Sequence, residues 1–238
     1  MPELTTERTL ADVVTEAPGA ARVFEAFGLD YCCGGRRRLG DACMAQGLDP
    51  TVVMDALVGL QPGPGPDWAA MDPAELVDHL EATHHAHLRR ELPRLDALLD
   101  KVTGVHGARH PELDEIGITF RALRNDLEPH LAKEERVLFP MIRELATATE
   151  RPTFHCGSVA NPISVMMAEH DRAGELLATL RRLTDGHVPP PDGCASYRAL
   201  FAGLADLEAD THLHVHKENN VLFPAVVAQE QRWTTASR

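Results

Sequence analysis

One pattern occurs twice in this chain, 84 residues apart (130 and 214). The first copy is His130-Leu-Ala-Lys-Glu134 with Val137-Leu-Phe-Pro140 after it, and the second is His214-Val-His-Lys-Glu218 with Val221-Leu-Phe-Pro224 after it. On a helix, residues four apart project from the same face, about one turn from each other. Each copy therefore predicts a helix that presents a His and a Glu together. Helical bundles hold pairs of metal ions with such residues on facing helices.

The repeat extends beyond this motif. His85 and His170 lie 85 residues apart (85 and 170), and the dipeptides Glu91-Leu92 and Glu175-Leu176 follow them. The repeat thus predicts a duplicated pair of helices. In each pair, the first helix offers one His and the second offers His-x-x-x-Glu.

Four amphipathic stretches support a helical bundle. They run over about 72–102, 111–146, 161–184 and 195–229, and loops rich in Gly, Pro and His separate them. Pro129 is expected to kink the second helix just before His130. No stretch alternates with the period of a strand, so we predict an all-α fold with an up-down-up-down four-helix bundle.

A shorter unit precedes the bundle. The run Gln-Pro-Gly-Pro-Gly-Pro-Asp at 61–67 predicts a linker, because no helix or strand passes through such a sequence. We therefore expect a small helical domain at 1–60 and the bundle at 68–238. Within the small domain, helices are expected over 11–27, 38–46 and 50–60, with Gly28 ending the first.

The repeated residues predict a two-metal site. The expected ligands are four imidazoles and two carboxylates: His85, His130, Glu134, His170, His214 and Glu218. Each metal would take two His, the two Glu would bridge, and an oxo or hydroxo bridge would leave a position open on each ion. Nitrogen and oxygen ligands without thiolates suit iron or manganese better than structural zinc. The alternative, ordinary surface pairs on helices, does not account for two copies in register.

Neighbouring histidines leave other ligand choices open. His84 and His87 flank His85 on the first helix, and the repeat spacing selects His85. On the fourth helix, His212 and His216 share a face roughly 200° from His214. The duplication favours His214, and the pair His212 and His216 is the alternative.

Composition narrows the function classes. A net charge of −13 argues against nucleic acid as a general partner, because phosphate binding needs a basic face. The sequence has no apolar run of about 18 residues, so we predict no membrane span. The N-terminus lacks the pattern of a signal peptide. Five cysteines, two of them adjacent, fit a reducing cytoplasm better than a disulfide scaffold.

The adjacent cysteines form a second candidate site. Cys32 and Cys33 lie in the segment Asp30-Tyr-Cys-Cys-Gly-Gly35, followed by Arg36-Arg-Arg38. A disulfide between neighbours is a strained ring, so two free thiols are expected. The arginines at an expected helix start would lower a thiol pKa. We expect a functional thiol pair that acts in redox chemistry or in transient contact with iron or a cluster; two buried small residues are the alternative.

Both motifs resemble those of a known family. The segments around His85, His130, His170 and His214 are similar to the hemerythrin-like domain of the iron–sulfur cluster repair di-iron (RIC) proteins, and Asp30-Tyr-Cys-Cys-Gly-Gly35 resembles that family's N-terminal motif. The resemblance covers nearly the whole chain. It implies a bacterial cytoplasmic protein with two non-haem irons in an oxo-bridged centre. The six residues listed above would be the ligands, with Glu134 and Glu218 bridging.

The resemblance also implies a function. Members of the family help to restore iron–sulfur clusters damaged by nitric oxide or oxidative stress, so damaged iron–sulfur proteins are the expected partners. NO or O₂ are the expected small ligands, and a homodimer is one expected assembly. Two alternatives stay open: an enzyme that reduces NO at the di-iron site, and an oxygen carrier or gas sensor. A pure oxygen carrier has no need of Cys32 and Cys33.

Overall fold

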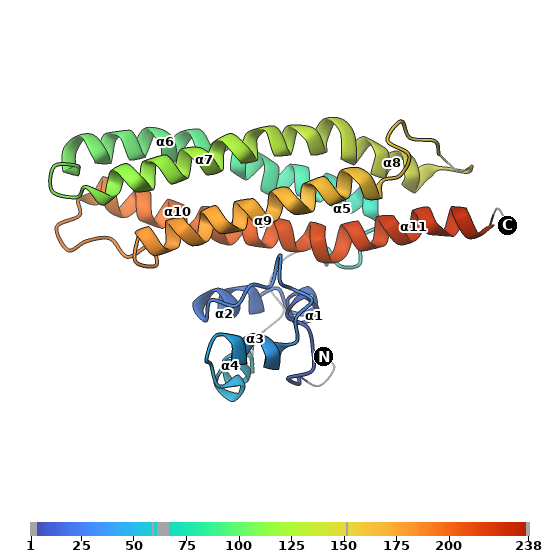
Figure 1. The fold of residues 1–238 in the computed structure, drawn as a ribbon, viewed down its shortest axis with the longest axis horizontal. Coiled ribbons are helices and arrows are strands. Elements are labelled where there is room, and N and C mark those ends of the chain that lie inside the picture. The colour runs from blue at the N-terminus through green and yellow to red at the C-terminus, as the bar shows by residue number, and fades with distance from the viewer. Residues whose placement is uncertain (1–3, 59, 61–66, 151, 237–238) are drawn as a thin grey trace.

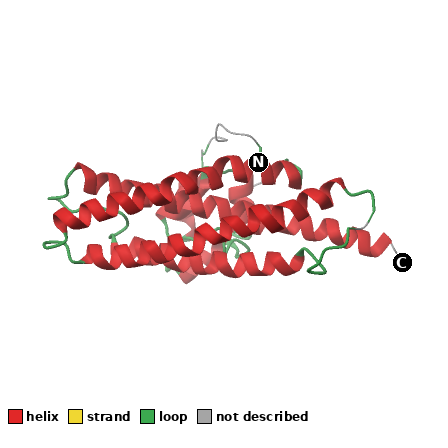
Figure 2. Ribbon diagram, turned by 90° about the horizontal axis from the view of Figure 1, so that it is seen from above, coloured by secondary structure: helices red, strands yellow, loops and turns green. Residues whose placement is uncertain are grey.

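Helices build the whole structure. The computed structural model describes residues 4–58, 60, 67–150 and 152–236. The regular elements in these ranges are all helical, which confirms the all-α prediction. A long bundle carries a small group of helices, α1 to α4, against one side (Figure 1). Seen from above, the long helices run along a common axis and cover much of the small group (Figure 2). Most of the expected linker, residues 61–66, lies outside the described residues.

The small N-terminal unit contains one helix more than expected. Its elements are α1 (Leu10–Glu16), α2 (Ala20–Ala26), α3 (Leu39–Ala45) and α4 (Pro50–Leu57). The prediction of one helix over 11–27 was therefore wrong. Proline disfavours helical geometry in the residue before it, and Ala17, which precedes Pro18, ends α1 in a non-helical conformation (φ −135°, ψ 84°).

Each of the four long helices appears close to its predicted range. The elements of the bundle are α5 (Pro73–Leu80), η1 (Glu81–His85), α6 (Ala86–His106), α7 (Glu112–Lys133), η2 (Glu134–Leu138), α8 (Phe139–Thr147), α9 (Ala160–Leu183), α10 (Ala195–Lys217), η3 (Glu218–Leu222) and α11 (Phe223–Ala236). Asp72 caps the first helix in a capping box with Glu75, and Pro73 occupies its first position.

Three of these long helices are interrupted by one turn of π-helix. The turns are η1, η2 and η3, while α9 is a regular α-helix throughout. The kink expected at Pro129 is not where α7 changes: α7 continues through Pro129 to Lys133, and the π-turn begins at Glu134. Single π-turns inside α-helices occur frequently at functional sites.

Two apolar cores fill the bundle, one on each side of its middle. One core contains Leu80 of the first long helix and Leu222 of the fourth. The other core contains Leu88 of the first long helix and Leu207 of the fourth. In the sequence, His85 lies between Leu80 and Leu88, and His214 and Glu218 lie between Leu207 and Leu222. The bundle is thus sealed by apolar side chains above and below a polar layer.

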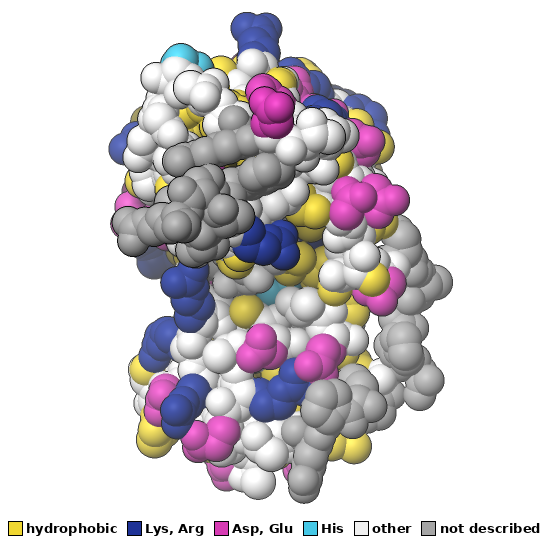
Figure 3. Space-filling model, turned by 90° about the vertical axis from the view of Figure 1, so that its right-hand side faces the viewer, with side chains coloured by type: hydrophobic (Ala, Val, Ile, Leu, Met, Phe, Trp, Pro, Cys, Tyr) yellow, Lys and Arg dark blue, Asp and Glu magenta, His cyan; other side chains and the backbone are white. Residues whose placement is uncertain are grey.

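A third core holds the small unit and joins it to the bundle. It is built from residues of α1 to α4, such as Phe24, from Tyr31 in the loop between α2 and α3, and from Val215 of α10. On the face shown in Figure 3, basic and acidic side chains are interspersed. None of the helices in the described ranges has an apolar stretch long enough to cross a membrane.

Candidate metal centre

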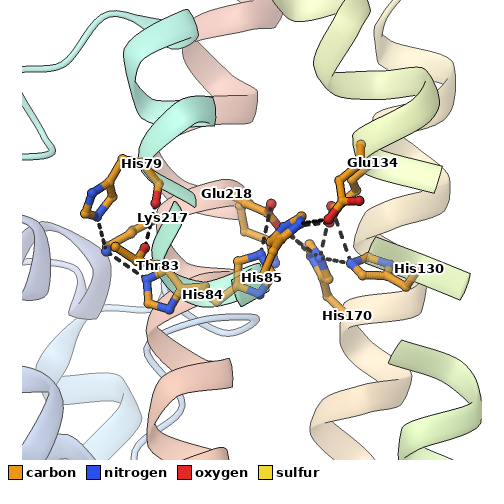
Figure 4. Close-up of polar contacts among 12 residues, drawn as sticks. His79, Thr83, His84, His85, His130, Glu134, His170, Lys217 and Glu218 are labelled. Atoms are coloured by element: carbon orange, nitrogen blue, oxygen red, sulfur yellow. Dashed lines mark hydrogen bonds and ion pairs between the residues drawn. The ribbon is translucent and has the colours of Figure 1, made fainter. Parts of the chain in front are cut away.

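All six predicted ligands meet in the middle of the bundle. The first helix contributes His85, the second His130 and Glu134, the third His170, and the fourth His214 and Glu218. Each of them is buried, and both glutamates are 0% exposed. Figure 4 shows His85, His130, Glu134, His170 and Glu218 converging from their helices.

Each π-turn begins or ends at one of these residues. His85 is the last residue of η1, Glu134 the first of η2, and Glu218 the first of η3. A π-turn inserts one extra residue per turn, which rotates the side chains that follow relative to those before. The three irregular turns therefore lie where the helices present the polar cluster.

The cluster divides into two groups that share both carboxylates. One group is His85, Glu134, His214 and Glu218, and the other is His130, Glu134, His170 and Glu218. Within each group the nearest ligand atoms all lie within 4.8 Å of one another. Each group takes one His from each half of the duplicated sequence. Two ions could thus each be bound by two imidazoles and bridged by the same two glutamates.

Short distances connect the carboxylates to the imidazoles. Glu134 Oε2 lies 3.5 Å from His85 Nε2, and Glu134 Oε1 lies 3.4 Å from His130 Nε2. Glu218 Oε1 and Oε2 lie 3.2 Å and 3.1 Å from the Nε2 atoms of His214 and His170. Each glutamate therefore faces one histidine of either group, as a bridging ligand requires.

Neighbouring polar groups orient three of the four imidazoles. The Nδ1 atoms of His85, His130 and His170 each lie 2.9 Å from an acceptor, which is Glu135, Glu169 and Asn219 respectively. With Nδ1 engaged as a donor, Nε2 keeps its lone pair and points into the cluster. Histidines that ligate metals are held in this way in most metalloproteins.

The donor set fits a pair of cations better than it fits an empty core. His85 Nε2 and both oxygens of Glu134 are buried without a hydrogen-bond partner, and buried polar atoms are seldom left so. Burial and the nearby Glu218 carboxylate raise the pKa of Glu134 well above its ordinary value. Burial would also raise the pKa of Glu218, but His214 and His170 lower it well below that value. Two metal ions would satisfy these atoms and offset both carboxylate charges.

The competing histidines lie elsewhere. His87 contacts Arg90 on its own helix, and His84 contacts Asp210 and Lys217. His216 donates from Nδ1 to the Tyr31 carbonyl 3.2 Å away, and His212 packs edge-on against the Tyr31 ring. The geometry therefore favours His214 over the alternative pair of His212 and His216, because that face of α10 meets the small unit.

His216 has a role that the sequence did not reveal. Its ring is fully buried between Tyr31 and Trp68, and its Nε2 lies 3.2 Å from the Thr15 hydroxyl. Burial lowers the pKa of His216 to about 4, so the ring is neutral at pH 7 and joins the bundle to the small unit by hydrogen bonds. No spacing in the sequence indicates a contact between residues 31 and 216.

Cys32 and Cys33 lie in the small unit, outside the six-residue cluster. Their sulfurs are 4.0 Å apart, both thiols are free, and Asp30 Oδ1 accepts from the backbone amides of both residues. Asn220 of the bundle donates to the Cys32 carbonyl at 2.9 Å. A Cβ at Gly35 would come within 2.4 Å of the Tyr31 carbonyl, so this tight loop needs glycine there.

The thiol environment differs from the expectation. The hydrogen bond with Cys33, burial and the Asp30 carboxylate raise the pKa of Cys32 well above its ordinary value. Two of the three arginines expected to lower it are engaged elsewhere: Arg38 pairs with Glu7, and Arg37 donates to the Asp41 carbonyl. Both cysteines instead line a cavity of about 570 Å³ between the small unit and the bundle, opposite Gly174 and Arg181.

Comparison with known proteins places both parts of the chain. Residues 76–226 match the hemerythrin HHE cation binding domain, and residues 6–61 match a domain of unknown function, DUF542. Among the similar curated proteins are those called iron–sulfur cluster repair protein YtfE. The one from Escherichia coli O157:H7 is 37% identical over 228 residues, and the one from Cronobacter sakazakii is 36% identical over 227. Each alignment covers 94% of this chain and 98% of the relative.

These matches extend over both the small unit and the bundle. They include the Cys-Cys-Gly-Gly loop and all six residues of the buried cluster. The chain therefore belongs to the hemerythrin HHE family, and within it to the two-domain proteins that include the YtfE iron–sulfur cluster repair proteins.

Proposed function

We propose that this chain is an iron–sulfur cluster repair protein that holds two non-haem irons in the middle of its bundle. His85 and His214 would bind one iron, His130 and His170 the other, and Glu134 and Glu218 would bridge them, together with an oxo bridge. The supporting observation is the buried group of four imidazoles and two carboxylates, in which both carboxylates are shared. Imidazole and carboxylate ligands suit iron, and the family match supports a bound cation.

Such a centre would supply iron, or electrons, to a damaged cluster. The chain's own residues prepare the site for that task. Glu135, Glu169 and Asn219 keep three Nε2 atoms aimed inward, and the apolar cores on either side exclude bulk water. Damaged iron–sulfur proteins are the proposed partners, NO and O₂ the proposed small ligands, and the bacterial cytoplasm the proposed place of action.

Cys32 and Cys33 are proposed to serve the partner rather than the resident metals. They lie in the small unit, line a cavity against α9, and do not contact the six-residue cluster. The raised pKa of Cys32 means that this thiol stays protonated until a partner or an approaching cation draws off the proton.

The function is tested in cells. A bacterial strain that lacks its own repair protein is treated with NO, and the recovery of a [4Fe–4S] dehydratase is followed with and without this chain. The protein is also purified anaerobically, and its iron is counted. We expect close to two irons per chain and recovery of the dehydratase. One tightly held zinc and no iron, or iron without recovery, would refute the proposal.

A further inference from the structure

The two copies of the repeated motif each carry a lysine just before the glutamate, and these two lysines have different surroundings. The side chain of Lys133 is 46% exposed and pairs with Glu169. Lys217 is buried, only 4% exposed. Its Nζ lies 2.9 Å from His79 Nε2 and 2.8 Å from His84 Nε2 (Figure 4). One repeat thus places a cation between two imidazoles where the other places it at the surface.

The two imidazoles around Lys217 are arranged as metal ligands would be. An ammonium only donates hydrogen bonds, so both Nε2 atoms must accept with their lone pairs. The Nδ1 of His84 lies 2.9 Å from Asp210, which repeats the carboxylate support of His85 and His130. The Trp68 ring lies 5.4 Å from Nζ and adds a cation–π contact. This is a cation site with two nitrogen donors, and the lysine occupies it.

This cation site adjoins the proposed iron centre. The His84 ring stacks on the His214 ring, with centroids 5.3 Å apart and planes 7° from parallel. On the other side, His79 of α5 is only partly buried. Figure 4 shows His79, Lys217 and His84 in sequence on one side of the cluster. The series therefore runs from a partly exposed imidazole to a residue of the centre itself.

We propose that His79 and His84 form a transfer site through which Fe²⁺ enters and leaves the centre, and that the Lys217 ammonium occupies this site and closes it. The inference rests on the proposed iron-binding function. When the Lys217 side chain swings out, both Nε2 lone pairs become available to Fe²⁺, with water completing the coordination. Imidazole suits this ion, and two protein ligands bind it weakly enough for onward transfer.

The charge of Lys217 accounts for the closure. A positive ammonium between two imidazoles repels a divalent ion in a poorly screened, buried position. Replacing it with leucine removes the charge and both hydrogen bonds while retaining an apolar stem. Lys133→Leu is the matched control, because it removes the equivalent lysine of the other repeat, which pairs with the Glu169 carboxylate.

The test measures metal binding and iron release. Metal-free protein is titrated with Co²⁺ by equilibrium dialysis. We expect two ions for the unmodified protein and for Lys133→Leu, three for Lys217→Leu, and two again for Lys217→Leu combined with His79→Ala. Iron-loaded protein is then mixed anaerobically with a ferrous chelator. Release from Lys217→Leu should be about tenfold faster, within the range over which groups around a metal site alter its affinity.

Folding and the dependence on the proposed function are controlled separately. Circular dichroism verifies the helices, and Lys217→Gln, which also removes the charge, replaces Lys217→Leu if that variant does not fold. An unmodified protein that holds no iron refutes the proposed function. An unmodified protein with two irons, combined with unchanged release and no third Co²⁺ in the Lys217 variants, refutes the transfer site alone.

Discussion

At the scale of single residues, the centre places two carboxylates in the core. Glu134 and Glu218 are fully buried and share their imidazole neighbours. Without cations, such a pair is costly, because a buried charge needs close compensation and like charges repel. The proposed metal ligands are therefore expected to lower the stability of the metal-free protein, a common cost of functional sites.

The substitution Glu134→Gln tests that cost. We expect the variant to lose most of its iron, because a neutral amide neither bridges two cations nor offsets their charge. The metal-free variant should nevertheless be more stable than the metal-free parent, by roughly 1–2 kcal/mol, since one of two adjacent buried carboxylates is gone. Iron per chain and urea unfolding of the metal-free proteins measure the two effects.

Glu91→Gln is the control for that substitution, because Glu91 pairs with Arg94 on the outside of α6. Glu91→Gln should change neither the iron content nor the stability of the metal-free protein. Normal iron content in Glu134→Gln would contradict the bridging role.

At the scale of elements, ion pairs fix the loop after α9 to the neighbouring helix. The buried Glu208 of α10 lies 2.6 Å from His187 Nε2 and accepts from Arg181 Nε at 2.9 Å. His187 has a positive φ of 65°, and its backbone N–H donates a hydrogen bond to the Thr184 hydroxyl. This cluster anchors the turn between the third and fourth helices, and so maintains the spacing of His170 and His214.

The substitution Glu208→Gln should destabilise the protein by about 3 kcal/mol at pH 7, because it leaves buried donors poorly paired. Burial works to raise the pKa of Glu208, but His187 and Arg181 lower it overall. A carboxyl group whose pKa is lowered by folding stabilises the protein at pH values above its unfolded-state pKa of about 4.3. This stabilisation is lost as the pH falls through the pKa of the folded state.

The difference in the free energy of unfolding between the parent and Glu208→Gln should therefore be constant from pH 7 to about 5. It should shrink below about pH 4.3. Urea unfolding of the metal-free proteins across this range measures it. A difference that grows on acidification would contradict the assigned direction of the pKa shift.

At the scale of the whole molecule, the small unit and the bundle have separate cores and separate chemistry. The six residues of the cluster all belong to the bundle, and the paired thiols belong to the small unit. Val215, His216 and Asn220 are among the residues that join them. This arrangement predicts that the two chemical sites can be disabled independently.

A chain of residues 68–238 alone should fold and keep two irons, because its apolar cores and its ligands are complete. It should be less stable than the full chain, since Val215 and His216 lose their cover. Iron per chain and the thermal unfolding midpoint measure the outcome. Loss of iron in the shortened chain would mean that the small unit completes the metal site.

Replacing Cys32 and Cys33 together with alanine should leave the iron content intact and impair cluster recovery in NO-treated cells. The thiols lie apart from the cluster yet line the cavity between the two parts of the chain. Iron analysis and dehydratase recovery test the two halves of this prediction. Full recovery of the dehydratase with the double variant would mean that Cys32 and Cys33 have only a structural role.

The sequence alone determined the helical class and the four long helices, and it grouped the six candidate ligands. These features are local or repeated: His and Glu four apart share a helix face, and the second copy in register selects His85 and His214 among their neighbours. The break at Pro18 was also readable in principle, because a proline restricts the residue before it. One helix was nevertheless predicted there.

Only the tertiary structure decided which groups surround those residues. The pairing of His85 with His214, and of His130 with His170, depends on how the two repeats pack. Cys32 is held as a thiol by its hydrogen bond with Cys33, by burial and by Asp30, against the expectation from nearby arginines. Identical lysines in the two repeats lie in different places, since only one repeat faces His79 and His84. Burial and charge arise from contacts across the chain, which no spacing along it records.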